Sequence, residues 1–283
     1  MDRLEVKTSF GSLCVYKRGE GERKIVLLHG SGCDNAMLSW REVMECFSDE
    51  YTVYAPDLLG YGRSAKPENM AGKHFYDIHS SAVKEMADKL GLDCFALAGL
   101  SMGGAIAMSF ALKYPQRVTA LFPVDTWGIS EKVPLGKLSE WYIHKTDFTL
   151  KQFGLIAKSR FLAKWFAGYS LIGDRKKITQ ELIGEITEAC LSDGAGKAML
   201  DYQRSSVFDG KTFPYYVNEL SQLKMPVMFI TGDKDPLVPV TDVQYAAEKA
   251  GVRICILKGC RHWSVKECPE RFCEAVDGVL SGL

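Results

Sequence analysis

Three side chains of this sequence have the types and the order that nucleophilic catalysis requires. Ser101 lies in GLSMG (residues 99–103), Asp235 in TGDKDPLVP (231–239) and His262 in GCRHW (259–263). A serine hydroxyl attacks poorly until a base takes its proton, and that base needs a carboxylate to fix its tautomer and stabilise its positive charge. The sequence therefore predicts Ser101 as nucleophile, His262 as base and Asp235 as the acid that orients the histidine.

The segment around Ser101 has the context that gives a GxSxG pattern its meaning. It follows an apolar run at 94–98 and precedes a helical pattern at 102–114, so Ser101 is expected on a strand-to-helix turn. Gly99, Gly103 and Gly104 would supply the room that such a strained turn needs. Unpaired N–H groups at the helix start would stabilise an oxyanion. The alternative is that Ser101 only caps the helix.

A second oxyanion donor is expected from HGSG (29–32), which follows the apolar run 24–28. Ligand crevices of wound sheets form at the carboxyl ends of strands, so this loop should lie near the nucleophile. We expect the backbone N–H groups of Ser31 and Met102 to point at the same oxygen, because two preorganised donors stabilise a tetrahedral intermediate better than one. His29 is expected to fix its loop by hydrogen bonding.

Other titratable residues are assigned structural roles. Asp57 follows the run 51–55 but precedes the nucleophile in the chain, so a turn role is expected for it. His74, His79 and His144 lack a loop position comparable to that of His262 and are expected in surface or core roles.

The remaining pattern predicts an α/β fold. Apolar runs at 24–28, 51–55, 94–98, 118–124 and 227–230 are typical of strands buried on both faces of a parallel sheet, and 253–257 is strand-like. Helical patterns at 102–114 and 241–250 alternate with them, and residues 4–8 and 13–17 suggest an antiparallel edge hairpin. We expect a mostly parallel wound sheet with helices on both faces.

Between residues 127 and 220 the strand pattern gives way to helical patterns. This predicts a helical cap insertion at 127–220 between two parts of one core, 1–126 and 221–283. Over residues 155–166, Leu155, Leu162 and Phe166 fall on one stripe, with Arg160 and Lys164 opposite. The nine aromatic residues between 127 and 169 are expected to form the insertion's own core and its contact with the sheet. The alternative is that they line a pocket for an apolar acyl or aromatic substrate.

Composition excludes several classes of function. The chain has 283 residues, and 35 Lys and Arg balance 35 Asp and Glu, so no overall electrostatic attraction to nucleic acid or to an anionic membrane is expected. The start lacks a secretory pattern and no run is long enough for a membrane span, so a cytoplasmic protein is expected. The nine cysteines lack CxxC spacing, which favours free thiols over a zinc site.

Taken together, the motifs LLHGSG, DLLGYGRS, GLSMGG, TGDKDPLVP and GCRHW resemble those of the α/β-hydrolase superfamily over essentially the whole chain. In that family the acid is normally the Asp ahead of a Val-Pro pair, so the resemblance selects Asp235 and leaves Asp233 as a turn former. The resemblance also implies an oxyanion hole from the backbone of Ser31 and Met102, and a cap or lid at 127–220.

The expected function is hydrolysis of a small carboxylic ester, lactone or thioester through an acyl-enzyme, with a small acyl substrate as partner and no metal or organic cofactor. The GLSMGG form is similar to that of small esterases, enol-lactone hydrolases and carbon-carbon bond hydrolases alike. Cleavage of a carbon-carbon bond in a vinylogous diketone therefore stays open. So does a catalytically idle hydrolase scaffold that only binds a ligand.

Overall fold

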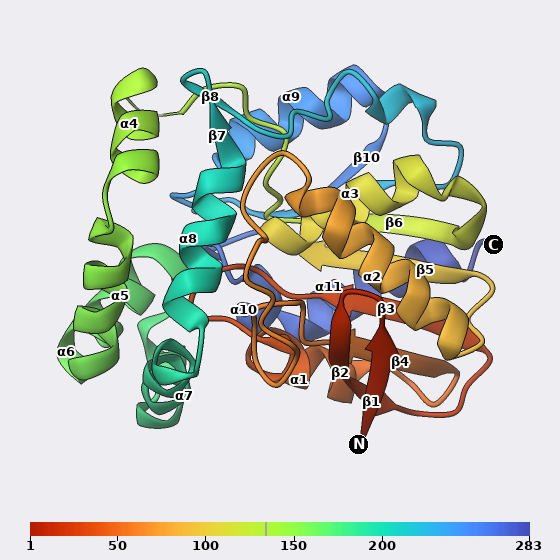
Figure 1. Ribbon diagram of the computed structural model, residues 1–283. Helices are drawn as coiled ribbons and strands as arrows, with labels where there is room; N and C mark the ends of the chain where they lie inside the picture. Colours follow the sequence, from red (N-terminus) through yellow and green to blue (C-terminus); the bar gives the residue numbers. More distant parts are fainter. Residues whose placement is uncertain (134) are drawn as a thin grey trace.

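One twisted, eight-stranded sheet organises the part of the chain that the computed structural model describes, residues 1–133 and 135–283 (Figure 1). The strand order is β1-β2-β4-β3-β5-β6-β9-β10. The strands are β1 (Asp2–Thr8), β2 (Gly11–Arg18), β3 (Arg23–Leu28), β4 (Tyr51–Pro56), β5 (Phe95–Leu100), β6 (Val118–Val124), β9 (Met228–Gly232) and β10 (Arg253–Leu257). The β1–β2 and β2–β4 pairs are antiparallel and all other pairs are parallel.

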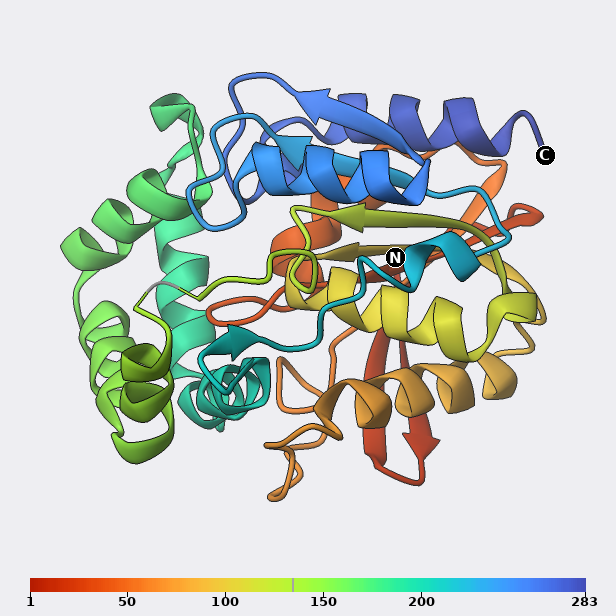
Figure 2. The same cartoon turned by 90° about the horizontal axis from the view of Figure 1, so that it is seen from above.

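Helices cover both faces of the sheet (Figure 2). On one face lie α1 (Ala36–Cys46), α10 (Ser264–Glu267) and α11 (Pro269–Leu280), and on the other α2 (Phe75–Lys89), α3 (Met102–Lys113) and α9 (Val240–Ala250). Short helical turns η1 (Pro115–Arg117) and η4 (Leu220–Gln222) precede β6 and β9. The wound α/β fold expected from the sequence is confirmed.

The central strands are apolar at nearly every position because both of their faces are buried. In β3, Ile25 and Leu27 pack into the core under α1 and α11, whereas Val26 and Leu28 pack into the core under α2 and α3. Successive side chains of a strand point to opposite faces, so a continuous apolar run fills both cores. The carboxyl ends of the parallel strands then meet along one edge of the sheet.

A group of helices follows β6 and lies beside that edge, and we call it the helical insertion. It consists of α4 (Lys137–Lys145), α5 (Phe148–Lys158), α6 (Arg160–Phe166), η2 (Ala167–Leu171), η3 (Arg175–Lys177), α7 (Gln180–Leu191) and α8 (Ala195–Ser206). A two-stranded sheet of β7 (Val207–Phe208) and β8 (Lys211–Thr212) follows it. The division of the chain at residues 126 and 220 stays a prediction.

The residues around 155–166 are helical as predicted, but they belong to two helices, so the prediction of a single stripe is wrong. Helix α5 ends before Ser159, which has an extended backbone. The side chain of Ser159 accepts the N–H of Leu162 and caps the start of α6. The predicted stripe is split as a result: Leu155 is exposed on α5, whereas Phe166 packs against the core from α6. No helix among the described residues is long and apolar enough to cross a membrane.

Candidate active site

Ser101 sits on a strained turn between β5 and α3. Its backbone angles are φ 53° and ψ −115°, a combination rare for a residue with a side chain. A Cβ at Gly99 would lie 2.2 Å from the Gly103 carbonyl oxygen, and one at Gly103 would lie 2.3 Å from that of Leu28. Glycine is therefore required at both positions, as predicted, because neighbouring backbone atoms occupy the space that a Cβ would need.

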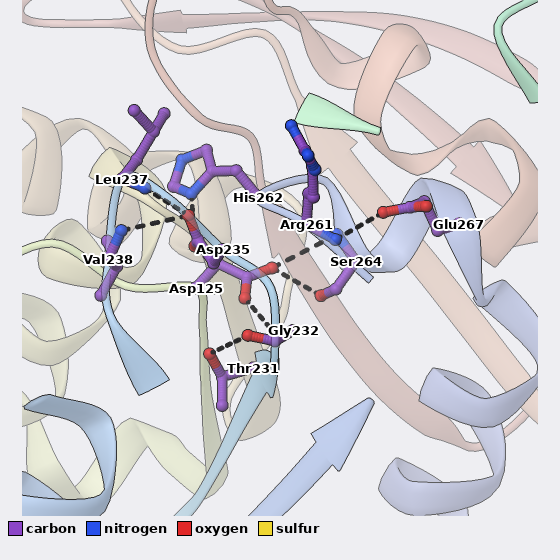
Figure 3. A network of polar contacts seen from close by, with 10 residues as sticks. All are labelled: Asp125, Thr231, Gly232, Asp235, Leu237, Val238, Arg261, His262, Ser264 and Glu267. Carbon is purple, nitrogen blue, oxygen red and sulfur yellow. Dashed lines mark hydrogen bonds and ion pairs between the residues drawn. The ribbon is translucent and has the colours of Figure 1, made fainter. Parts of the chain in front are cut away.

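His262 and Asp235 come together from two neighbouring loops (Figure 3). Asp235 follows β9 and His262 follows β10, and His262 Nδ1 lies 2.7 Å from Asp235 Oδ2. The other oxygen, Oδ1, accepts the backbone N–H groups of Leu237 at 2.7 Å and Val238 at 3.1 Å. Because an ionised carboxylate only accepts hydrogen bonds, Nδ1 carries the proton and Nε2 is the basic nitrogen.

The surroundings of His262 favour its protonated form. Burial lowers the pKa of His262, but the charge of Asp235 and its hydrogen bond act in the opposite direction. The charges of Asp125 and Asp34 add to this effect, and the pKa of His262 lies above its ordinary value. A histidine in this setting tolerates becoming cationic after it has taken a proton.

The loop that holds Ser31 is fixed by buried polar contacts. Asp34 Oδ2 accepts the N–H of Gly30 at 2.8 Å, and burial raises the pKa of Asp34 to about 6. His29 Nε2 accepts the N–H of Leu58 at 2.9 Å, and burial lowers its pKa to about 4. His29 is therefore a neutral loop-fixing group, as the sequence predicted.

Two further carboxylates have the structural roles expected of them. Asp57 accepts the N–H groups of Ala36 and Arg63, at 2.9 and 2.8 Å. Asp233 Oδ1 accepts the N–H of Gly259 at 2.6 Å and so ties the loop after β9 to the loop after β10. Neither contacts His262, whereas Asp235 does.

A cavity of about 490 Å³ lies between the sheet edge and the helical insertion. Ser101 and His262 both line it, and so does Ser31, one of the two predicted oxyanion donors. Met102, the other, is the first residue of α3, where the N–H has no acceptor within the helix. The two side chains predicted to react thus face one space large enough for a small substrate.

Most of the cavity wall comes from the helical insertion. Its lining residues there are Ser139, Ile143, Thr149, Gln152, Phe153, Ile156, Phe166, Leu171, Cys190, Met199, Tyr202, Gln203 and Ser206. Of the nine aromatics between 127 and 169, Trp127, Phe153 and Phe166 line the cavity. Trp141, Phe148, Phe161, Trp165 and Tyr169 are exposed, so the prediction that these rings form the insertion's own core is wrong for those five.

Asp125 is a part of the site that sequence reasoning missed. It directly follows β6, is fully buried and has a φ of 40°. Its Oδ1 accepts the N–H of Gly232 at 2.8 Å, and its Oδ2 accepts the Ser264 hydroxyl at 2.5 Å and the Ser264 N–H at 3.3 Å (Figure 3). One carboxyl thus joins the loop that carries Asp235 to the loop that carries His262.

The position of Asp125 at the carboxyl end of a buried strand was the available signal, because ligand sites collect there. Burial raises the pKa of Asp125 to about 7, and the nearby charge of Asp235 contributes to the rise. His262 and the hydrogen bonds from Ser264 and Gly232 oppose it. A carboxyl in this position changes its protonation near neutral pH.

The sequence and the fold of the chain resemble those of known proteins. Residues 24–269 match the family described as alpha/beta hydrolase fold. A 2-hydroxy-6-oxononadienedioate/2-hydroxy-6-oxononatrienedioate hydrolase from Burkholderia vietnamiensis is 28% identical over 264 residues, which cover 90% of this chain and 85% of that protein.

Two solved structures share the fold. The 2-hydroxy-6-oxo-6-phenylhexa-2,4-dienoate hydrolase from Rhodococcus sp. strain RHA1 has a TM-score of 0.80 at 17% identity, with 99% of each chain covered. A thermophilic esterase from Thermogutta terrifontis has a TM-score of 0.77 at 22% identity, with 100% of this chain and 99% of that chain covered.

Replacing Asp125 with Asn should make stability less sensitive to pH. The folded pKa of about 7 lies above the unfolded value of about 3.9, so the folded state binds this proton more tightly. The carboxyl therefore destabilises the fold progressively as the pH rises from about 4 to about 7. Over that range the free energy of unfolding of Asp125→Asn, measured in urea, should rise relative to that of the wild type.

Ser264→Ala is the matched control, because it removes a hydroxyl donor to Asp125 and keeps the carboxyl. It should cost about 1 kcal/mol, and its stability should still fall as the pH rises, with the fall extending to higher pH because a hydrogen bond that lowers the pKa of Asp125 is gone. A difference between Asp125→Asn and the wild type that stays constant from pH 4 to pH 8 would contradict the raised pKa.

Proposed function

Because the chain belongs to the α/β-hydrolase fold family, we propose that it is a serine hydrolase that cleaves a small, uncharged ester, lactone or thioester. The reaction passes through an acyl-enzyme on Ser101. The observation that carries the proposal is the 2.7 Å hydrogen bond between His262 and Asp235, made where His262 and Ser101 line one cavity.

In the first half of the reaction, His262 Nε2 takes the proton of Ser101 Oγ as that oxygen bonds to the substrate carbonyl carbon. The carbonyl oxygen becomes an oxyanion, which the backbone N–H groups of Ser31 and Met102 stabilise. The tetrahedral intermediate collapses, the bond to the leaving alcohol or thiol breaks, and His262 gives that group its proton. Asp235 stabilises the histidine cation throughout.

In the second half, a water molecule replaces the leaving group. His262 takes one of its protons while the water oxygen bonds to the acyl carbon. When the second tetrahedral intermediate collapses, the bond to Ser101 Oγ breaks and His262 returns the proton to the serine. The products are a carboxylic acid and the regenerated hydroxyl, and no metal or organic cofactor takes part.

The charge of the cavity favours a neutral substrate. Among the described residues that line it there is no Lys, Arg, Asp or Glu. Burying a carboxylate without a cationic partner costs several kcal/mol. The Burkholderia relative is named for a dienedioate, which carries two carboxylates, and the described residues of this cavity include no lysine or arginine to pair with them.

Carbon-carbon bond cleavage is the second candidate, because the Burkholderia relative covers 90% of the chain at 28% identity. In that reaction His262 would move protons to and from substrate carbon. The test compares esters with a vinylogous diketone that carries a carboxylate. A higher kcat/KM for the diketone than for every ester tested would favour this candidate over the first.

Ser101→Ala should abolish covalent labelling by a fluorophosphonate probe and lower ester turnover by about 10³-fold or more, because the attacking oxygen is removed. Intact-mass spectrometry measures the labelling. Ser192→Ala, which changes a serine outside the cavity lining, is the control and should label like the wild type. Labelling of Ser101→Ala at wild-type stoichiometry would refute the assignment of the nucleophile.

The pH profile of kcat/KM should have an acid limb with its midpoint above about 6.5, because His262 acts as a base only when neutral and its pKa is raised. Asp125→Asn removes one of the charges that raise this pKa, so the midpoint should move to lower pH. Ser264→Ala keeps the carboxyl and removes only a hydrogen bond that lowers its pKa, so it should move the midpoint less than Asp125→Asn does. If the midpoint does not move in Asp125→Asn, the charge of Asp125 does not raise the pKa of His262.

A neutral p-nitrophenyl ester should be hydrolysed with a kcat/KM at least about tenfold above that of an ester of equal length ending in a carboxylate. Gln152→Lys places a cation at the cavity wall and should narrow this ratio. Gln222→Lys adds the same charge outside the lining and should leave the ratio unchanged. Equal rates on both esters in the wild type would refute the neutral-substrate assignment.

A further inference from the structure

Large apolar side chains exposed at the surface gather on the helical insertion. Of the fourteen such residues identified among the described ones, eight lie between residues 138 and 169. They are Leu138, Trp141, Phe148, Leu150, Leu155, Phe161, Trp165 and Tyr169. Single exposed apolar residues are ordinary, but a concentration on α4, α5, α6 and η2 marks an interaction surface.

Apolar residues alternate with lysines along α4 and α5. On α5, Phe148, Lys151, Leu155 and Lys158 are spaced by three or four residues, so they share one stripe of the helix, and all four are exposed. On α4, Leu138, Trp141 and Lys145 have the same kind of spacing and exposure.

The stripe on α6 continues into η2 and is aromatic. Phe161, Trp165 and Tyr169 are four residues apart and 77%, 60% and 59% exposed. The rings of Trp165 and Tyr169 stack at 5.3 Å between centroids, with 3° between their planes. Exposed Lys164 adjoins this stripe.

The charge of this surface is positive. Residues 137–166 contain six Lys and Arg, at 137, 145, 151, 158, 160 and 164, and two acidic residues. Both acidic side chains are engaged by neighbouring elements: Glu140 accepts the N–H groups of residues 209 and 210, and Asp147 pairs with Arg204 at 3.3 Å. The lysines at 145, 151, 158 and 164 are exposed among the apolar side chains.

The opposite sides of the same helices face the cavity. Ile143 of α4, Phe153 and Ile156 of α5 and Phe166 of α6 line it. The exposed stripes therefore serve neither the cavity nor the core. Figures 1 and 2 both show α4, α5 and α6 at the margin of the molecule farthest from the sheet.

We propose that the outer face of α4, α5, α6 and η2, which we call the outer face of the insertion, docks on a lipid surface with anionic headgroups. Trp and Tyr rings partition into the interface region of a bilayer, and lysine stems bury beside them while their ammonium groups reach the phosphates. The core of a protein–protein interface is depleted in lysine, so a second copy of the chain fits this surface less well.

Vesicle binding tests the proposal without catalysis, in the full chain carrying Ser101→Ala. The protein should cosediment with phosphatidylcholine vesicles that contain phosphatidylglycerol. The combined change Phe161→Ser, Trp165→Ser and Tyr169→Ser should weaken this binding at least about tenfold, because the inserted rings are lost. Tyr245→Ser with Leu283→Ser, which removes exposed apolar side chains elsewhere, is the control and should bind as before.

A charge variant gives an independent test, since it changes only exposed side chains. The combined change Lys145→Gln, Lys151→Gln, Lys158→Gln and Lys164→Gln should reduce binding to the anionic vesicles and remove its salt dependence, while binding to pure phosphatidylcholine stays unchanged. Absence of vesicle binding by the starting protein, or binding that neither variant alters, would overturn the proposal.

Sedimentation velocity, run in parallel, separates lipid docking from self-association. Dimerisation that is lost in the aromatic variant, without vesicle binding, would assign the surface to a second copy of the chain and overturn lipid docking. Because every arm uses Ser101→Ala, these outcomes are independent of whether the proposed ester hydrolysis is correct.

Discussion

The contact of α3 with the sheet is the constraint on which the rest of the site depends. Backbone approaches backbone at Gly99 and Gly103, and a Cβ at Gly104 would lie 2.2 Å from the Thr126 hydroxyl. This packing holds the start of α3 against the ends of β3, β5 and β6 and forces Ser101 into a φ of 53°. Ser101 thus lines the cavity directly ahead of Met102, the first residue of α3.

Asp125 holds the His262–Asp235 half of the site in place, as the glycines hold the turn that carries Ser101. It accepts hydrogen bonds from both loops that carry the His262–Asp235 pair, and Asp233 adds a second tie between them. A buried carboxyl with a pKa near 7 is a costly way to join them, and that cost is accepted where precise placement of a histidine matters.

The helical insertion serves two surfaces with the same short helices. One side of α5 contributes Phe153 and Ile156 to the cavity, and the other presents Phe148 and Leu155 to solvent. Docking of the outer face on lipid would bring the cavity, whose described lining includes no lysine or arginine, close to a source of neutral esters. The two proposals support each other in this way, although each is tested separately.

The sequence by itself determined the sheet, the nucleophile turn and the order of Ser101, Asp235 and His262. Buried parallel strands demand continuous apolar runs, and β6 and β10 have the bounds predicted for them. The glycines around Ser101 indicate the turn in the sequence itself, because the close approach of backbone there requires them. Each of these signals is contained in a few adjacent residues.

Only the tertiary structure decided which side chains meet across the fold. The role of Asp125 depends on Gly232 and Ser264, which are more than a hundred residues away in the chain. The aromatics between 127 and 169 could not be sorted into wall and surface from the sequence, because the sorting depends on which side of each helix faces the cavity. A local hydrophobic pattern fixes what an element prefers to bury, whereas the path of the chain fixes which side is covered.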